Sequence, residues 1–185
     1  MSPAPGYMTV DEYFNTPVSL TPTELIYGRF RAAESPAVRH QAAVAHLFLT
    51  LHSHVREHTL GQMWVSPLDV VLDTERDLIM QPDLFFIADD RMWIVRERIY
   101  GAPDLVVEVL SPKPRIGSTE ERIRLFAENG VRECWLVHQD RQEVTVIGYA
   151  QRRIREQHIY GRRDAIRSGV LPRFAATWDE IFDNN

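Results

Sequence analysis

Apolar positions recur with two periods along the chain, and the change of period predicts an alternation of helices and strands. From Pro36 to about His58 the spacing of three and four residues is typical of one buried face of a helix. That face consists of Val44, Leu47, Phe48, Leu51 and Val55. Ser35 and Pro36 offer an N-cap and a first-turn residue, and Gly61 offers an end, so this segment is predicted to be a long helix.

Short apolar runs bounded by proline, aspartate or glycine predict the strands. Residues 83–88 and 105–110 are nearly continuous apolar runs, which suits strands buried on both faces. The segment from Met63 to Leu72 is expected to be one strand, with Pro67 indicating an edge or a bulge. A first strand or hairpin arm is expected at 24–33, and further strands are expected at 134–137, 144–149 and 154–160, the last three forming a meander.

Three shorter helices complete the predicted order. Thr9 with Glu12 has the spacing of a capping box and starts a helix over 9–15. Ser118 to Asn129 ends at Asn129-Gly130, a glycine C-terminal cap, and 177–182 is the last helix. The fold class is therefore mixed α/β, with strands before and after a central helix. We expect one domain over 1–185, in which 1–23 is an N-terminal extension carrying the short first helix.

Composition narrows the class of protein. With 185 residues, 44% hydrophobic and 25% charged, the chain suits a packed globular domain. Its single cysteine excludes a disulfide scaffold and a cysteine-rich zinc site, and no apolar run approaches the roughly 20 residues of a membrane helix. We therefore expect a cytoplasmic protein. The net charge of −5 disfavours indiscriminate binding to duplex DNA but permits a local basic groove.

Two carboxylates stand out as candidates for chemistry. Glu108 interrupts the apolar run 104–110, where an ionised carboxylate needs a cation, a proton or a hydrogen-bond network. A salt bridge to an arginine, or a position at a solvent-facing strand end, is the simpler alternative. Asp83 begins the other apolar strand. If the two strands are neighbours, Asp83 and Glu108 converge on one hard cation such as Mg²⁺, with Mn²⁺ as a substitute.

Histidine and cysteine offer further candidates. His40 lies four residues before Val44 on the apolar side of the long helix, so it can point towards the two carboxylates or serve as a core or cap histidine. His54 and His58 have a metal-ligand spacing, but solvated helix histidines are the simpler interpretation. Cys134 lies in an apolar strand and is interpreted as a buried structural thiol.

Several segments, taken in order, resemble the Uma-type family of “putative restriction endonucleases”, which belongs to the PD-(D/E)XK nuclease superfamily. The resemblance spans about residues 24–182 and is most specific at 101–112. The segments are Glu24-Leu-Ile-Tyr-Gly28, Ser35-Pro-Ala-Val-Arg-His40, Gln81-Pro-Asp-Leu84, Gly101-Ala-Pro-Asp-Leu-Val-Val-Glu-Val-Leu-Ser-Pro112 and Gly130-Val-Arg-Glu-Cys-Trp-Leu-Val137. The resemblance implies a restriction-endonuclease-like core, a central mixed sheet flanked by helices, with Asp83 and Glu108 as its motif acids.

The same resemblance locates the motif cation. In the superfamily, a lysine normally stands two residues after the motif glutamate, where this chain has Leu110. In the Uma-type family, the lysine comes instead from the following helix, and the matching position in this chain is Arg122. Arginine is a permanent cation that cannot act as a base near neutral pH. Ser118 stands where the family often carries an acid. Lys113, the one lysine of the chain, replaces the missing amine only if its loop folds back.

These residues lead to two functional hypotheses. The first is a Mg²⁺-dependent endonuclease that hydrolyses DNA phosphodiester bonds with metal-activated water, in which Asp83 and Glu108 hold the metal and Arg122 or Lys113 stabilises the developing charge. The second is a catalytically impaired nuclease-fold module that binds DNA or a protein partner. Late-strand arginines are either a phosphate-contacting rim or simply an exposed strand face: Arg152, Arg153 and Arg155. A homodimer, matching the two-fold symmetry of DNA, is expected.

Overall fold

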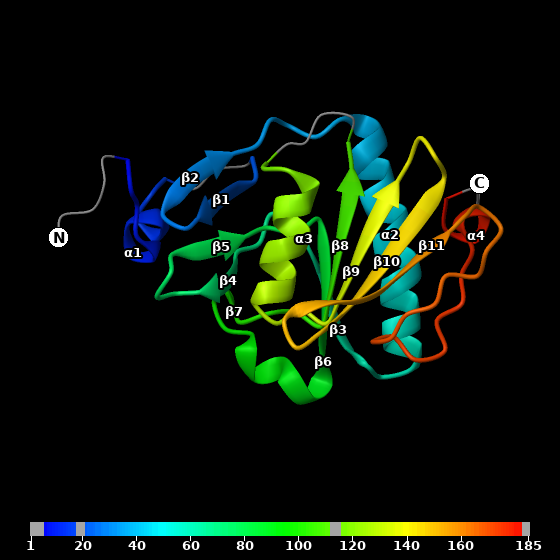
Figure 1. The fold of residues 1–185 in the computed structure, drawn as a ribbon. Helices are drawn as coiled ribbons and strands as arrows, with labels where there is room; N and C mark the ends of the chain where they lie inside the picture. Colours follow the sequence, from blue (N-terminus) through cyan, green and yellow to red (C-terminus); the bar gives the residue numbers. More distant parts are fainter. Residues whose placement is uncertain (1–5, 18–20, 112–115, 183–185) are drawn as a thin grey trace.

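The structure is a computed structural model that describes residues 6–17, 21–111 and 116–182 (Figure 1). Its helices are α1 (Val10–Phe14), α2 (Val38–Glu57), α3 (Thr119–Glu128) and α4 (Trp178–Phe182), with a 3-10 helix, η1 (Asp89–Ile94). Its strands are β1 (Thr23–Ile26), β2 (Arg29–Ala32), β3 (Gly61–Val65), β4 (Val70–Asp73), β5 (Leu78–Met80), β6 (Leu84–Ala88), β7 (Ile99–Tyr100), β8 (Leu105–Leu110), β9 (Glu133–His138), β10 (Glu143–Ala150) and β11 (Arg153–Tyr160).

The strands form two mixed sheets. The larger has six strands in the order β11-β10-β9-β8-β6-β3, and only its β8–β9 pair is parallel. The smaller has five strands in the order β2-β1-β5-β4-β7, with a parallel β4–β7 pair. The mixed α/β class is confirmed, but the central sheet expected from the sequence is accompanied by a second sheet.

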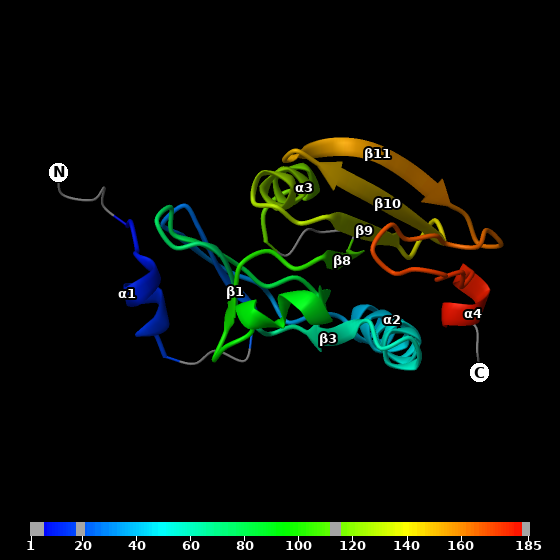
Figure 2. The ribbon, with the colours of Figure 1, turned by 90° about the horizontal axis from the view of Figure 1, so that it is seen from below.

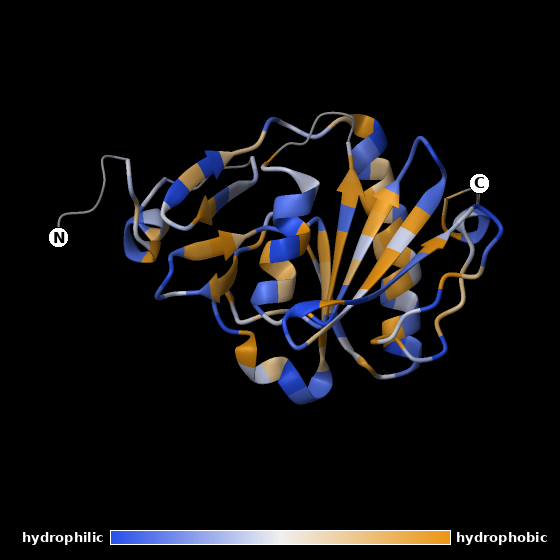
Figure 3. Ribbon diagram, viewed as in Figure 1, coloured by the Kyte–Doolittle hydropathy of each residue, from blue (hydrophilic) through white to orange (hydrophobic). Residues whose placement is uncertain are grey.

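Helices cover both faces of the larger sheet (Figure 2). Leu47 and Leu51 of α2 pack with Val107 and Trp135 on one face. On the other face, Phe126 of α3 packs with a second buried cluster that includes Phe85, Val106 and Cys134. Figure 3 shows apolar residues concentrated on β8, β9 and β10, whereas most of β11 is exposed. β8, which carries Glu108, and β6, which directly follows Asp83, are both buried in this core.

Most predicted elements are confirmed. Thr9 and Glu12 form the capping box of α1, and Ser118 caps α3, accepting from the backbone N–H of Glu121 at 3.1 Å. Beyond α3, Gly130 has a φ of 94°, the left-handed conformation expected at a glycine cap. The meander over β9, β10 and β11 is present, and the strands at 83–88 and 105–110 are β6 and β8.

The predicted caps of the long helix are wrong. Its N-cap is Ala37, which makes no side-chain capping bond, so Ser35 and Pro36 precede the helix rather than begin it. Its C-terminal end comes before Gly61: Thr59 has a φ of 51°, and the N–H of Leu60 donates to the carbonyl of Val55 at 3.0 Å. Gly61 instead begins β3, where a Cβ would lie 2.1 Å from the carbonyl oxygen of Ile87.

The single strand expected at 63–72 is also wrong. β3 ends at Val65 and β4 begins at Val70, and the two belong to different sheets. Pro67 lies in the connection, where it lacks the N–H that a continuous strand needs. Sequence patterns missed β5, η1 and β7, since each is too short to show a clear period of apolar residues. Within the residues described, no helix combines the length and apolar character needed to cross a membrane.

Candidate active site

Asp83 and Glu108 converge because their strands are neighbours. β6 and β8 run antiparallel with Leu84 opposite Val107, and extending that register by one residue places Asp83 opposite Glu108. Both side chains are buried. The expectation that these strands bring the two acids together is therefore confirmed.

Asp83 is held from two elements. Its Oδ2 atom accepts from the backbone N–H of Val109 at 2.8 Å and lies 3.2 Å from Nε2 of His40. His40 is on the buried face of α2, so the helix periodicity correctly predicted its direction. These contacts fix the carboxylate of Asp83 beside Glu108.

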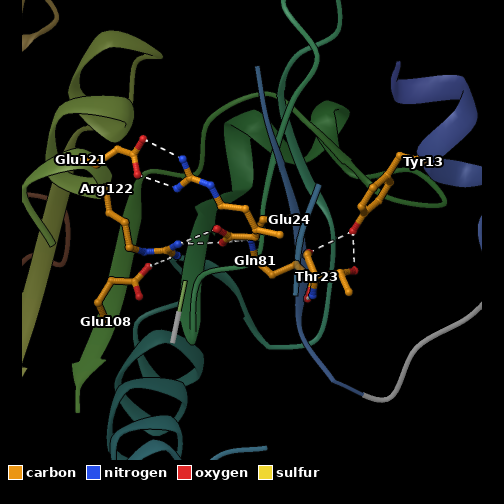
Figure 4. Close-up of polar contacts among 8 residues, drawn as sticks. Tyr13, Thr23, Glu24, Gln81, Glu108, Glu121 and Arg122 are labelled. Atoms are coloured by element: carbon orange, nitrogen blue, oxygen red, sulfur yellow. Dashed lines mark hydrogen bonds and ion pairs between the residues drawn. The ribbon is translucent and has the colours of Figure 1, made fainter. Parts of the chain in front are cut away.

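Arg122 links two carboxylates from different sheets (Figure 4). Its Nη2 donates to Oε1 of Glu108 at 2.7 Å, and its Nη1 lies 2.8 and 2.7 Å from the two carboxylate oxygens of Glu24. Burial alone lowers the pKa of Arg122, but Glu108 and Glu24 together raise it above its usual range. The first turn of α3 therefore presents a permanent cation to the acids.

Glu24 is a site residue that the sequence analysis did not single out. It lies in β1 with no exposure, and its Oε1 also accepts from the backbone N–H of Gln81 at 2.8 Å. The sequence pattern around Glu24 resembles that around Glu108, because in each case a carboxylate stands next to apolar strand residues that are buried. Glu24 was overlooked because the run around it is short and weakly periodic.

Burial dominates the electrostatics of Glu108. Desolvation raises the pKa of Glu108 to about 7, although Arg122 acts to lower it and the neighbouring Asp83 charge acts to raise it further. Oε2 of Glu108 accepts no hydrogen bond from the described residues, whereas Oε1 is bound by Arg122. Of the two oxygens of this carboxylate, Oε1 is therefore the one that the described part of the chain engages.

A hollow opens over these groups. Its polar lining includes Glu24, Asp83, Glu108 and Arg122, and Gly117 contributes to its wall where the chain enters α3. Asp83 and Glu108, which keep a small exposed fraction, therefore reach solvent at this hollow, whereas Glu24 is fully buried behind them. Within the parts of the chain described, no cluster of three or more histidine, cysteine or acidic residues suits a metal ion.

The other sequence candidates that the structure describes are not brought to this site. Lys113 lies outside the described residues. Cys134 is a buried strand thiol, and desolvation raises its pKa above the usual range. The rings of His54, in α2, and His58, the C-cap of that helix, stack with centroids 4.3 Å apart, and His54 also contacts the carbonyl of Pro172.

The late-strand arginines lie at the other end of the larger sheet. The register across β8, β9, β10 and β11 places Ile159 level with Glu108, whereas Arg153 is six residues away along β11. Six residues of strand correspond to about 20 Å. Arg152, Arg153 and Arg155 are exposed, but they do not line the hollow.

Comparison with known proteins identifies the family. The sequence matches the family Uma2, described as “Putative restriction endonuclease”, over residues 10–179. The chain belongs to this family. The Uma2 match includes Glu24, Asp83, Glu108 and Arg122 within its limits. No curated protein matches the chain.

One solved structure supports the fold. A protein from Anabaena variabilis ATCC 29413, described as a “putative nuclease”, superposes with a TM-score of 0.79 and 19% sequence identity. The alignment covers 95% of this chain and 98% of that one. At this identity the likeness establishes a shared fold over nearly the whole of both proteins.

Proposed function

We propose that this member of the Uma2 family is a divalent-metal-dependent endonuclease that hydrolyses phosphodiester bonds in DNA. The observation that carries the proposal is the convergence of Asp83, Glu108 and Arg122 at one hollow. The family description and the nuclease described for the similar fold support it.

The donor set fits Mg²⁺ or Mn²⁺. Asp83 and Glu108 would hold the ion, since Mg²⁺ typically takes one or two carboxylates and leaves its other positions to water and phosphate. Oε2 of Glu108, which accepts no hydrogen bond from described residues, is a suitable donor. When bound, such an ion supplies an activated water and neutralises charge on the phosphate.

The protein groups position the substrate and its charge. The backbone N–H of Val109 and the ring of His40 keep Asp83 in place. Arg122 presents a guanidinium that remains protonated at all relevant pH values, so it stabilises negative charge on the phosphate but takes no proton. Its fixed attachment to two carboxylates makes it a preorganised cation.

Cleavage of supercoiled plasmid DNA tests this function. We expect nicked or linear product with Mg²⁺ or Mn²⁺, and none with EDTA or in Asp83→Asn. Asp140→Asn, which alters an exposed aspartate paired with Arg39, is the matched control and should cleave like the wild type. Equal product in Asp83→Asn and wild type would exclude this site as the nuclease centre.

A second function rests on Arg122 itself. A guanidinium clamped by Glu24 and Glu108 replaces the amine that the family resemblance leads us to expect, which favours a module that binds DNA without cutting it. DNA binding without cleavage in wild type, together with cleavage in Arg122→Lys, would support this alternative. Cleavage by the wild type excludes it.

We also propose that the protein acts as a homodimer. β11 is the outer strand of the larger sheet and is exposed along most of its length, so its free edge offers a surface for a second copy. Light scattering at micromolar concentration tests the dimer. A mass near the monomer value of 21.5 kDa at every concentration would overturn it.

A further inference from the structure

Glu24 is a third carboxylate at the site, contributed by the smaller sheet. We propose that Glu24 is a positioning residue: it compensates the charge of Arg122 and so keeps Asp83 and Glu108 available for a divalent cation. This inference rests on the proposed function. It assigns Glu24 a role that acts through Arg122 rather than on the metal or the substrate.

The contacts of Arg122 are unequal. Both carboxylate oxygens of Glu24 lie within 2.8 Å of Nη1, whereas Glu108 makes one contact, from Oε1 to Nη2. Glu24 has no exposure to water, and the backbone N–H of Gln81 fixes its Oε1. Arg122 is therefore drawn towards Glu24, and the second oxygen of Glu108 is left for another ligand.

Charge counting gives the same assignment. With Asp83, Glu24, Glu108 and Arg122 all ionised, the site carries a net charge of −2, which one divalent cation balances. If Glu24 lost its charge, Arg122 would neutralise Glu108 and leave only Asp83 uncompensated. A nearby opposite charge stabilises a bound ion strongly where water is excluded, so the affinity for a divalent cation should fall.

Glu24 is unsuited to direct ligation. Arg122 engages both of its oxygens, and Gln81 engages one of them a second time. Gln81 is two residues before Asp83, so Glu24 also anchors the chain that leads into the site. These contacts distinguish a positioning residue from a metal ligand, and the distinction can be measured.

Calorimetric titration with Mn²⁺ provides the test, with four variants beside the wild type. Glu24→Gln keeps the acceptor for Gln81 but removes the charge, and should weaken Mn²⁺ binding at least about tenfold. Glu24→Asp keeps the charge and should stay within about threefold of wild type. Glu24→Gln combined with Arg122→Gln removes opposite charges together and should recover affinity to within about threefold.

Glu121→Gln is the matched control. Glu121 lies next to Arg122 on α3 but pairs with Arg31, so its loss should change Mn²⁺ affinity less than about threefold. Circular dichroism and melting temperature establish that each variant is folded.

The outcomes separate the possible roles. Weak binding in Glu24→Gln that the double variant restores supports the positioning role. An equal loss of Mn²⁺ affinity in Glu24→Gln and in the double variant would make Glu24 a direct ligand. Unchanged affinity in Glu24→Gln with a lower melting temperature would give Glu24 a purely structural role. Either result overturns the inference but leaves the proposed nuclease function intact. Absence of Mn²⁺ binding in the wild type would overturn both.

Discussion

The chain carries Pro-Asp-Leu twice, at 82–84 before β6 and at 103–105 before β8, and the two aspartates meet different surroundings. Asp83 contacts His40 and the backbone of Val109 beside an open hollow. Asp104 has no exposure; it accepts from the backbone N–H of Ala88 at 2.9 Å.

Two arginines complete the surroundings of Asp104. Arg91 and Arg132 donate to its Oδ1 at 2.9 and 3.0 Å. Because β6 and β8 are antiparallel, the two strand starts lie at opposite ends of the pair. The aspartate of the same tripeptide is therefore paired with two arginines at one end and lies beside the hollow at the other.

Asp104→Asn should have the largest effect on stability. The substitution keeps the shape but removes the charge that balances Arg91 and Arg132, so we expect a loss of about 3 kcal/mol in the free energy of unfolding. Because both arginines are partly exposed to water, this loss of unfolding free energy is at the lower end of the range typical of a broken buried ion pair. Urea denaturation measures it, and folded Asp104→Asn should bind Mn²⁺ like the wild type.

Asp83→Asn should show the reverse pattern. It removes an anionic donor beside Glu108, so Mn²⁺ affinity should fall at least about 100-fold, or about 2.7 kcal/mol, while unfolding free energy changes by less than about 1 kcal/mol. Calorimetry and urea denaturation of one preparation give both values. A large loss of stability with intact metal binding would place Asp83 in the same structural class as Asp104.

Glu108→Gln should repeat the metal phenotype of Asp83→Asn. Its Oε1 would still accept from Arg122, so the fold should survive, whereas the anionic Oε2 is lost. Mn²⁺ titration is again the measurement. Unchanged affinity would remove Glu108 from the metal site and leave the salt bridge to Arg122 as its whole function.

Local sequence explains why one aspartate was recognised and the other was not. The apolar runs correctly predicted β6, β8 and the convergence of Asp83 with Glu108, because the neighbouring strands fix both positions. The partners of Asp104 come from 13 residues before it and 28 residues after it, contacts that no local pattern encodes.

The same limit accounts for the other misses. Glu24 reaches Arg122 across 98 residues of sequence, and the second sheet depends on which short strands pair. The direction of His40 was predictable because helix periodicity fixes it, whereas Arg122 was located by the family resemblance. Features set by local spacing could therefore be predicted, whereas features set by the pairing of distant segments could not.

Glu133, near Asp104, shows what a buried carboxylate does without arginines. It accepts from Trp135, Ser168 and the backbone of Gly169, and desolvation raises its pKa above the usual value. The folded protein therefore keeps this proton at a pH where the unfolded chain, with a pKa of about 4.3, has lost it. The stabilisation linked to this proton is fully present below the unfolded pKa of Glu133 and is lost as the pH rises through its raised pKa in the folded protein.

Glu133→Gln should flatten this pH dependence. As the pH rises from the unfolded to the folded pKa of Glu133, the wild type should lose about 1.4 kcal/mol of unfolding free energy for each unit between these two pKa values. The Glu133→Gln variant should not show this loss. Urea denaturation at a series of pH values from about 4 to 7 measures the two slopes. Parallel slopes would show that the proton of Glu133 is not linked to folding, whatever the variant's absolute stability.

Charge reversal of Arg152 and Arg155 should have the smallest effect of these substitutions. It tests whether DNA contacts the end of the larger sheet where Asp104 lies. Both residues are exposed: Arg155 lies four residues, or about 13 Å, along β11 from the level of Glu108, and Arg152 lies just before the start of that strand. If each contacts a phosphate, Arg152→Glu with Arg155→Glu should reduce the slope of log affinity against log salt by about 2. Arg96→Glu, an exposed reversal on the loop before β7, is the control and should leave the slope unchanged. An unaltered slope in the double variant, with plasmid cleavage retained, would confine DNA binding to the hollow at Asp83.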